Sequence, residues 1–281
     1  MSNDITIVNT LELPSPQEWQ EGLNLNPFKK LTIDISELDI SDDMATALVY
    51  EDLQYWVQQH NNKAKSLNIT YVLLKHYYDK GIPDDEWISW RSGGIDYMPH
   101  FQPEHWYIRD WFHFFVEIYY YRIFSLWDSV VGFINIFYQM HFNQDISLRK
   151  KVLKELSVQK PQLYIIFTSI KGDPLYNEAS EYRNNMVHNL PPTEVIFRTS
   201  VKNVSEADHQ RFLNTDSPLG NHITTNRPST IFSISPSFGE YITTKKLMDN
   251  IINFTSFSGD KLQEIMSTIK QDRFAFKPPP K

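Results

Sequence analysis

The stretch WYIRDWFHFFVEIYYYRIFSLWDSVVGFINIFYQMHF, residues 106–142, decides the fold. It contains no proline and one glycine, Gly132. As a continuous helix it would be about 55 Å long at about 1.5 Å per residue. Apolar side chains cover most of its circumference, a pattern typical of a buried or membrane-spanning helix. Glu117, Arg122 and Asp128 interrupt the run before roughly 18 uncharged residues accumulate, which argues against a membrane span. The sequence therefore predicts a mainly α fold, a helical bundle around one long central helix.

A polar stripe runs along one side of this predicted helix. At about 100° per residue its members lie within about 60° of one another; they are Asp110, Glu117, Asp128, Gly132, Asn135 and Gln139. The stripe fits two interpretations, a solvated edge or a polar seam that faces another helix or a second copy of the chain. A carboxylate buried in such a seam would need a cation as its partner.

Composition narrows the class of protein. The 281 residues, 41% of them hydrophobic and 14% aromatic, fit one large or two small domains with a sizeable core. The absence of cysteine excludes disulfides, thiolate zinc sites and a cysteine nucleophile. A net charge of −7 argues against a protein that coats long nucleic acids, although a local site can still bind one phosphate. No signal peptide is recognisable, so we expect a cytoplasmic protein.

Residues 1–103 are predicted to be an N-terminal extension packed on the bundle. Period-two alternation indicates two short strands, around Ile5–Ile7 and Leu31–Ile35. A helix is expected from Ser41 or Asp42 to about Asn61, and a second helix or extended piece from Leu67 to Tyr78. Residues 82–104, rich in aromatic and turn residues, are predicted to be a loop.

Residues 104–281 are predicted to form the bundle itself, with a β-hairpin inserted near 195–235. After the central helix, new helices are expected at Asp145 or Ser147, at Pro161 and at Pro174. The helix from Pro174 must end before Pro191-Pro192. Strands are predicted at Val195–Val201 and Thr230–Ile234, a last helix at about Tyr241–Asp272, nicked at Gly259, and a disordered tail at 277–281.

The residues that could carry chemistry lie in the segment EYRNNMVH, residues 181–188. Glu181, Asn184 and His188 share one helix face, so Glu181 or Asn184 could hold one ring nitrogen of His188. The helix dipole favours the protonated imidazole in the last turn, and a histidine poised near neutrality suits proton transfer. Arg183 projects about 140° from His188 on a regular helix. The two can meet on one phosphate if the helix end is distorted or if two chains combine their copies.

A purely structural interpretation of this segment also stands. Arg183 is then an ion-pair partner of Asp128 or Glu117, and His188 is a residue at a helix end.

The segment and its context together resemble the HEPN superfamily. The resemblance rests on the long aromatic helix with Leu126-Trp127-Asp128 and Asn135, and on Arg183-Asn184-x-x-x-His188 before two prolines. It covers about residues 104–272. The family motif is an arginine, a polar residue, three to five further residues and a histidine, present here in its shortest form. Such domains are helical bundles, usually dimers.

The resemblance implies a metal-independent endoribonuclease without a cofactor, of toxin or phage-defence type. His188 would be the general acid or base on the 2′-hydroxyl or the leaving 5′-oxygen, Arg183 would stabilise charge on the phosphate, and Asn184 would orient His188. Asp128, Asn135 and Glu181 are the expected supporting residues. The implied partners are RNA at a local site, a second copy of the chain, and an inhibitor or antitoxin protein. Leu190 stands where some HEPN toxins carry a modified tyrosine, so that regulation is not implied.

The alternative function is a non-catalytic HEPN-like scaffold that binds nucleotides or proteins. Other chemistry has weaker support in the sequence. His100, His105 and His113 with Asp110 match no zinc-helix spacing, and neither a GxSxG elbow nor a glycine-rich phosphate loop is present.

Overall fold

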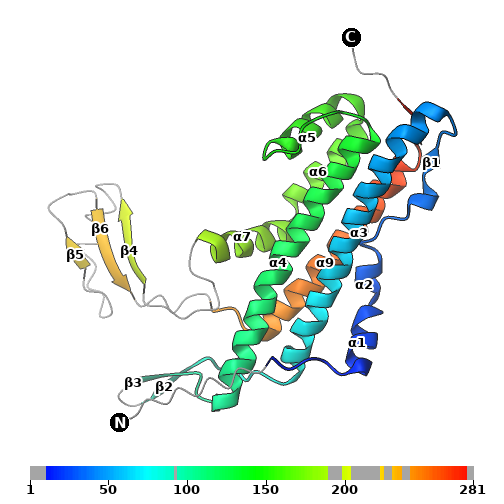
Figure 1. The fold of residues 1–281 in the computed structure, drawn as a ribbon. Coiled ribbons are helices and arrows are strands. Elements are labelled where there is room, and N and C mark those ends of the chain that lie inside the picture. Colours follow the sequence, from blue (N-terminus) through cyan, green and yellow to red (C-terminus); the bar gives the residue numbers. More distant parts are fainter. Residues whose placement is uncertain are drawn as a thin grey trace. The chain divides into compact units, whose positions relative to one another are not determined.

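The structure is a computed structural model that describes residues 11–91, 94–188, 198–203, 222–224, 230–235 and 241–276. It is mainly helical, which confirms the predicted fold class (Figure 1). The chain divides into two compact units, Met1–Asn184 with Thr244–Lys281, and Asn185–Thr243.

The first unit contains most of the helices. Its elements are α1 (Pro16–Leu23), α2 (Asn26–Lys29), the 3-10 helix η1 (Ile35–Glu37), β1 (Asp39–Ile40), α3 (Met44–Asp79), β2 (Ile88–Arg91), β3 (Gly94–Tyr97), α4 (Pro103–Phe137), α5 (Leu148–Gln159), α6 (Pro161–Gly172), α7 (Pro174–His188, whose last turn passes into the second unit), α9 (Thr244–Ile269) and β7 (Arg273–Phe274).

The second unit contains a three-stranded antiparallel sheet in the order β4-β6-β5. Its strands are β4 (Arg198–Asn203), β5 (His222–Thr224) and β6 (Thr230–Ser235). The predicted hairpin is confirmed in the pairing of β4 with β6, where Val201 lies opposite Phe232. β5, within the predicted polar loop, was not expected.

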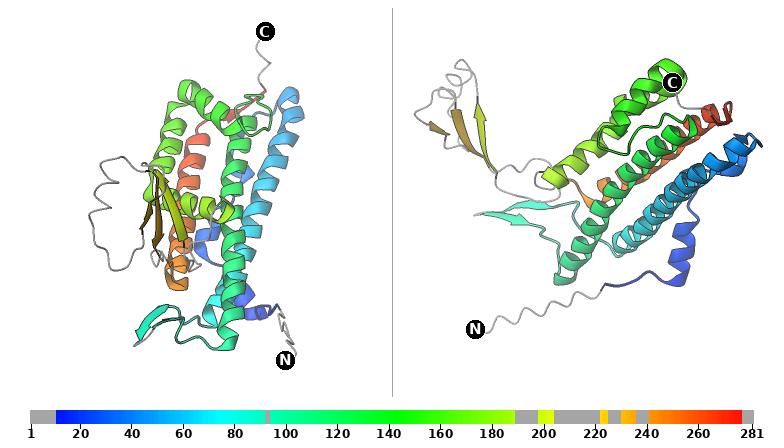
Figure 2. Two further views of the ribbon diagram at one scale, coloured as in Figure 1. Left: turned by 90° about the vertical axis from the view of Figure 1, so that its left-hand side faces the viewer. Right: turned by 45° about the horizontal axis from the view of Figure 1, so that its top comes forward.

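The long helix α4 is the core of the first unit, with α3 and α9 beside it (Figures 1 and 2). Most of its apolar side chains between Ile108 and Phe137 are buried, including Phe112, Tyr119, Ile123 and Phe133. The predicted central helix is therefore confirmed. It ends earlier than expected, because Gln139 and His141 take left-handed backbone conformations, with φ of 51° and 58°.

The polar stripe of α4 combines both interpretations offered by the sequence. Asp110 and Asp128 are exposed. Gly132 and Asn135 are buried: the amide of Asn135 donates to the Phe142 carbonyl at 3.0 Å and accepts from the Phe142 N–H at 3.2 Å. Gln139 donates to the carbonyl of Ala275 at 2.6 Å. The C-terminal part of the stripe thus holds neighbouring backbone segments in place.

α3 and α4 approach closely at Gly132. A Cβ atom added at this glycine would lie 2.3 Å from Cζ3 of Trp56 on α3. One turn further along α3, buried His60 joins three segments: Nε2 lies 2.8 Å from the Leu31 carbonyl and Nδ1 lies 3.0 Å from Oγ of Ser129. Burial lowers the pKa of His60 to about 4, so the ring is neutral at pH 7.

The N-terminal predictions need three corrections. α3 is one continuous helix capped by Asp43, whose carboxylate accepts from the Thr46 N–H at 2.8 Å. The helix does not end at Asn61, because that amide bonds both backbone groups of Ile33. Leu31–Ile35 is not a strand, although Leu31 and Ile33 are buried. The other predicted strand, Ile5–Ile7, lies outside the described residues.

The third correction concerns residues 82–104, which contain the antiparallel pair β2–β3 rather than a loop alone, with Ile88 opposite Tyr97. Further along the chain, α5, α6 and α7 begin where the capping residues and prolines predicted. α9 runs through Gly259 without a break, because this glycine packs against Lys30 and the Pro27 carbonyl. The tail at 277–281 lies outside the described residues.

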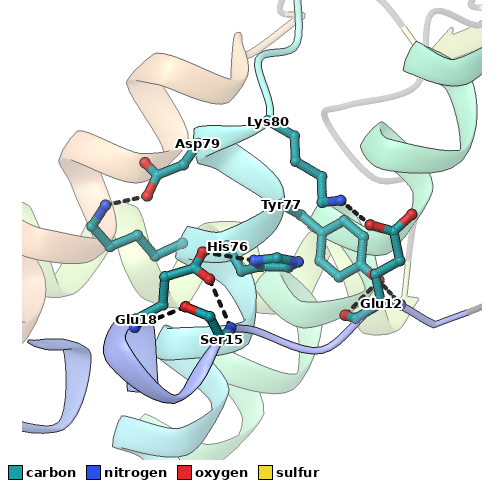
Figure 3. A network of polar contacts seen from close by, with 8 residues as sticks. Glu12, Ser15, Glu18, His76, Tyr77, Asp79 and Lys80 are labelled. Atoms are coloured by element: carbon teal, nitrogen blue, oxygen red, sulfur yellow. Dashed lines mark hydrogen bonds and ion pairs between the residues drawn. The ribbon is translucent and has the colours of Figure 1, made fainter. Parts of the chain in front are cut away.

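A polar network fastens the segment before and within α1 to the end of α3 (Figure 3). His76 Nδ1 lies 2.9 Å from the Glu18 carboxylate, and Glu12 pairs with Lys80. The Glu12 N–H donates to the Tyr77 hydroxyl at 2.9 Å. Hydrogen bonds from His76 and from Ser15 lower the pKa of Glu18 to about 2.

The Glu18 contact predicts a pH-dependent contribution to stability. Because the folded-state pKa lies below the unfolded value near 4.5, the contribution is complete above about pH 4.5 and is lost as the pH falls toward 2. Thermal unfolding from pH 2 to 7 should show Glu18→Gln melting below the wild type at neutral pH and converging with it in acid. Glu21→Gln is the matched control, since Glu21 bonds Gln17 of its own helix. A constant difference across the pH range would contradict this assignment.

The close contact at Gly132 predicts that adding one methyl group there, as in Gly132→Ala, destabilises the protein. Overpacking costs about 1–3 kcal/mol, which exceeds the helix-propensity gain of up to about 1 kcal/mol for alanine. Gly132→Ala should therefore lower the free energy of unfolding in a denaturant titration. Gly172→Ala, at a site where a Cβ meets nothing within 4 Å, is the control and should be neutral or slightly stabilising. Equal effects of the two substitutions would refute the close-contact argument.

Candidate functional site

The helix that carries the predicted motif is α7, and its start is well defined by the local sequence. The Asp173 carboxylate accepts from the Leu175 N–H at 2.9 Å, and Pro174 occupies the first helical position. The helix extends to His188, three residues before the proline pair that must end it.

One face of α7 packs against α4 through aromatic rings. The ring of Tyr182 lies 4.7 Å from that of Tyr120, and the ring of Tyr176 lies 5.6 Å from that of Phe124. Ala179, which lies between Tyr176 and Tyr182 in the sequence, is also buried. On the exposed side, Glu178 accepts from the Asn250 amide of α9 at 2.8 Å. These contacts fix the rotation of α7 about its axis up to the turn that carries Arg183.

Arg183 is half-buried, and its guanidinium lies over an aromatic ring. Its Cζ atom is 5.5 Å from the ring centroid of Phe124, within the range of a cation–π contact. Its Nε atom is buried and has no hydrogen-bond partner. Among the residues that the structure describes, no ion pair joins Arg183 to Asp128. The structural interpretation of Arg183 as the ion-pair partner of Asp128 is therefore wrong, and the pairing with Glu117 stays a prediction.

The other predicted site residues lie in different surroundings. Asn184 and Glu181 are exposed on α7. His188 is the last residue of the helix, and its side chain lies outside the described part. Asp128 lines a cavity with Lys63 and Arg149, and Asn135 holds the backbone that follows α4. The convergence of Arg183, Asn184 and His188, and the supporting roles of Asp128, Asn135 and Glu181, remain predictions.

Two of the three histidines considered for metal binding have other hydrogen-bond partners, and the third, His113, is buried with no partner on either ring nitrogen. His100 pairs with Glu86 at 3.0 Å, and the His105 ring accepts from the Gln102 N–H at 2.9 Å. Burial, together with Arg109, lowers the pKa of His113 to about 3. In the described part of the chain, no three metal-ligating side chains lie together, and no helix is long and apolar enough to cross a membrane.

Comparison with known families adds an independent observation. The model of a HEPN family, the Cthe2314-like HEPN domains, matches residues 56–226, more than half of the chain and the whole of the predicted motif. The chain belongs to this HEPN family. The HEPN match begins inside α3, so the family domain starts earlier than the resemblance at 104–272 suggested. Searches of curated proteins and of solved structures found no match.

Sequence reasoning missed the aromatic platform under Arg183. Phe124 is one of many apolar residues in the stretch 106–142, and periodicity alone cannot show which core ring a distant helix will cover. Lys63 and Arg149 were also missed, because each is an ordinary surface cation in its own helix and only the fold places both on one cavity with Asp128.

The position of Arg183 predicts a small effect on stability. A cation–π contact contributes about 0.5–1 kcal/mol at exposed sites and about 2 kcal/mol when desolvated, whereas a stranded buried carboxylate would cost about 3–5 kcal/mol. Because Arg183 is half-buried and Asp128 is exposed, Arg183→Met should lower the free energy of unfolding in urea by about 1–2 kcal/mol. Phe124→Leu in the same experiment should remove the Arg183 dependence. A loss of 3 kcal/mol or more for Arg183→Met would show that it neutralises a buried anion.

Proposed function

We propose that this HEPN protein is a metal-independent endoribonuclease that acts as a homodimer, of toxin or phage-defence type. The observation that carries the proposal is the motif Arg183-Asn184-x-x-x-His188 at the end of α7, within the segment matched by the HEPN family.

The reaction would be an internal transfer of the phosphodiester. The 2′-hydroxyl oxygen attacks phosphorus, the bond to the 5′-oxygen breaks, and the products are a 2′,3′-cyclic phosphate and a 5′-hydroxyl. His188 would take the proton of the 2′-hydroxyl or give one to the leaving 5′-oxygen, with Asn184 orienting its ring. Arg183 would stabilise the extra negative charge on the phosphate oxygens.

A dimer answers the geometric difficulty of the motif. Arg183 and His188 point about 140° apart on one regular helix. Two copies of α7 facing each other across a two-fold axis would bring the arginine of one chain near the histidine of the other. Asn184 and Glu181, both exposed, leave that face of α7 accessible to a second copy.

The overall charge of −7 favours a local site over an extended RNA-binding surface. It is also the observation that favours the second candidate, a non-catalytic scaffold that binds nucleotides or proteins. The two candidates differ in whether the motif turns over RNA, which a direct assay decides.

The assay is cleavage of single-stranded RNA in EDTA, with detection of 2′,3′-cyclic phosphate ends. His188→Ala should reduce the rate by about 10²–10⁴-fold because it removes the general acid or base. Arg183→Met should reduce it by about 10²–10³-fold because it removes the phosphate-stabilising donor.

His100→Ala and Arg273→Met are matched controls, since both residues are exposed and lie outside the motif, and both variants should retain wild-type activity. Equal rates for the wild type, His188→Ala and Arg183→Met would rule out the enzymatic assignment. An inactive wild type that still binds RNA or nucleotide would support the scaffold.

A further inference from the structure

A cavity of about 430 Å³ lies beside α4 on the side that carries Asp128. It is an open cavity lined by α3, α4, the start of α5 and the connection between α4 and α5, and its walls include Trp56, Lys63, Asp128, Ser129, Gln144 and Arg149. Small-molecule sites typically measure about 300–1,000 Å³, so this cavity can hold a ligand of the size of one nucleotide. None of the motif residues on α7 lines it.

Two cations from different helices face this cavity, and each is held in place by one bond. Lys63 Nζ donates to the Ser125 carbonyl at 3.1 Å. Arg149 Nη1 donates to the Tyr176 hydroxyl at 3.0 Å, and its Cζ lies 5.8 Å from that ring centroid. An ammonium has three donors and a guanidinium five, so both side chains keep donors for a ligand. Such a pair is suited to a phosphate.

Asp128 supplies a group of the opposite kind. It is exposed and makes no hydrogen bond or ion pair with any residue that the structure describes. The neighbouring Asp145 is already engaged, because Lys151 and Ser147 bond its carboxylate at 2.8 Å. An ionised carboxylate only accepts hydrogen bonds, so Asp128 selects a ligand that offers N–H donors, best as two donors side by side.

Trp56 contributes an aromatic side chain to the wall of the cavity. Its indole is half-buried, and its ring edge rests against Gly132, which has no side chain to displace it. Aromatic side chains bind nucleobases by stacking. The cavity therefore combines an aromatic side chain, two cations and one carboxylate.

We propose that this cavity binds a guanine mononucleotide, with the phosphate on Lys63 and Arg149, the base on Trp56 and its Watson–Crick edge on Asp128. Guanine is the base whose edge sets two N–H donors, N1–H and the N2 amino group, next to each other. Adenine and cytosine place an acceptor beside their amino group, and uracil flanks its N–H with two carbonyls. The same chemistry is present in free GMP and in a 5′-phosphorylated guanosine at the end of an RNA strand.

The test is isothermal titration of the full chain with GMP, AMP and the tetraribonucleotide pGUUU. GMP should bind at least tenfold more tightly than AMP. Asp128→Asn should abolish this preference, because an amide offers one acceptor where the carboxylate offers two. Lys63→Met should weaken GMP and AMP alike and reduce the salt dependence of binding. If pGUUU binds as tightly as GMP, the ligand can be the 5′ end of an RNA strand. If pGUUU binds much more weakly, the ligand is the free nucleotide.

Matched controls come from the same helices. Asp110→Asn changes an exposed aspartate five turns from Asp128 on the same side of α4, and Lys65→Met changes an exposed lysine two residues after Lys63 that does not line the cavity. Both should bind GMP as the wild type does. Absence of GMP binding at millimolar concentration, or an Asp128→Asn variant that keeps the preference for GMP, would overturn the proposal. Neither readout depends on RNA cleavage, so failure of the proposed nuclease activity is distinguishable.

Discussion

The contact between Gly132 of α4 and the indole of Trp56 on α3 sets the geometry on which the rest of the first unit depends. It brings two helices of 35 and 36 residues close enough for His60 to bridge Ser129 and the Leu31 carbonyl. Buried polar groups are stable when they are hydrogen-bonded, and both ring nitrogens of this neutral histidine are satisfied by the approach. The N-terminal segment is thereby fixed to the same pair of helices that forms the core.

One face of α4 packs against α3, and two further faces contact different parts of the molecule. One carries Tyr120 and Phe124 and receives α7. The other carries Asp128 and opens into the cavity. Tyr176 belongs to both regions, because its ring packs on Phe124 while its hydroxyl accepts from Arg149. The orientation of α7 and the position of a cavity cation are therefore set by the same side chain.

The predictability of this fold follows from the range of the forces involved. The apolar pattern of residues 106–142, the caps at Asp173 and the prolines at 161 and 174 act locally, and they correctly placed α4, α6 and α7. Asn61 was read as a helix end because its intrinsic propensity is low, yet a distant backbone at Ile33 satisfies its amide and α3 continues. The same limit applies to the site: the spacing of Arg183, Asn184 and His188 is visible in sequence, whereas Phe124, Lys63 and Arg149 acquire meaning through contacts between helices far apart in the chain.

The placement of Arg183 also bears on how an acidic protein can present a cationic site. A guanidinium paired with a carboxylate would contribute little field to an approaching phosphate, because the opposite charge lies within a few ångströms. Over the face of Phe124 the cation is stabilised by the ring quadrupole and keeps its full charge. Charges further than about 8–10 Å away are largely screened at physiological salt, so most of the net −7 has little effect at this point. In the proposed site, a single arginine on an aromatic ring would attract one phosphate locally, although the net charge of −7 disfavours the binding of extended nucleic acid.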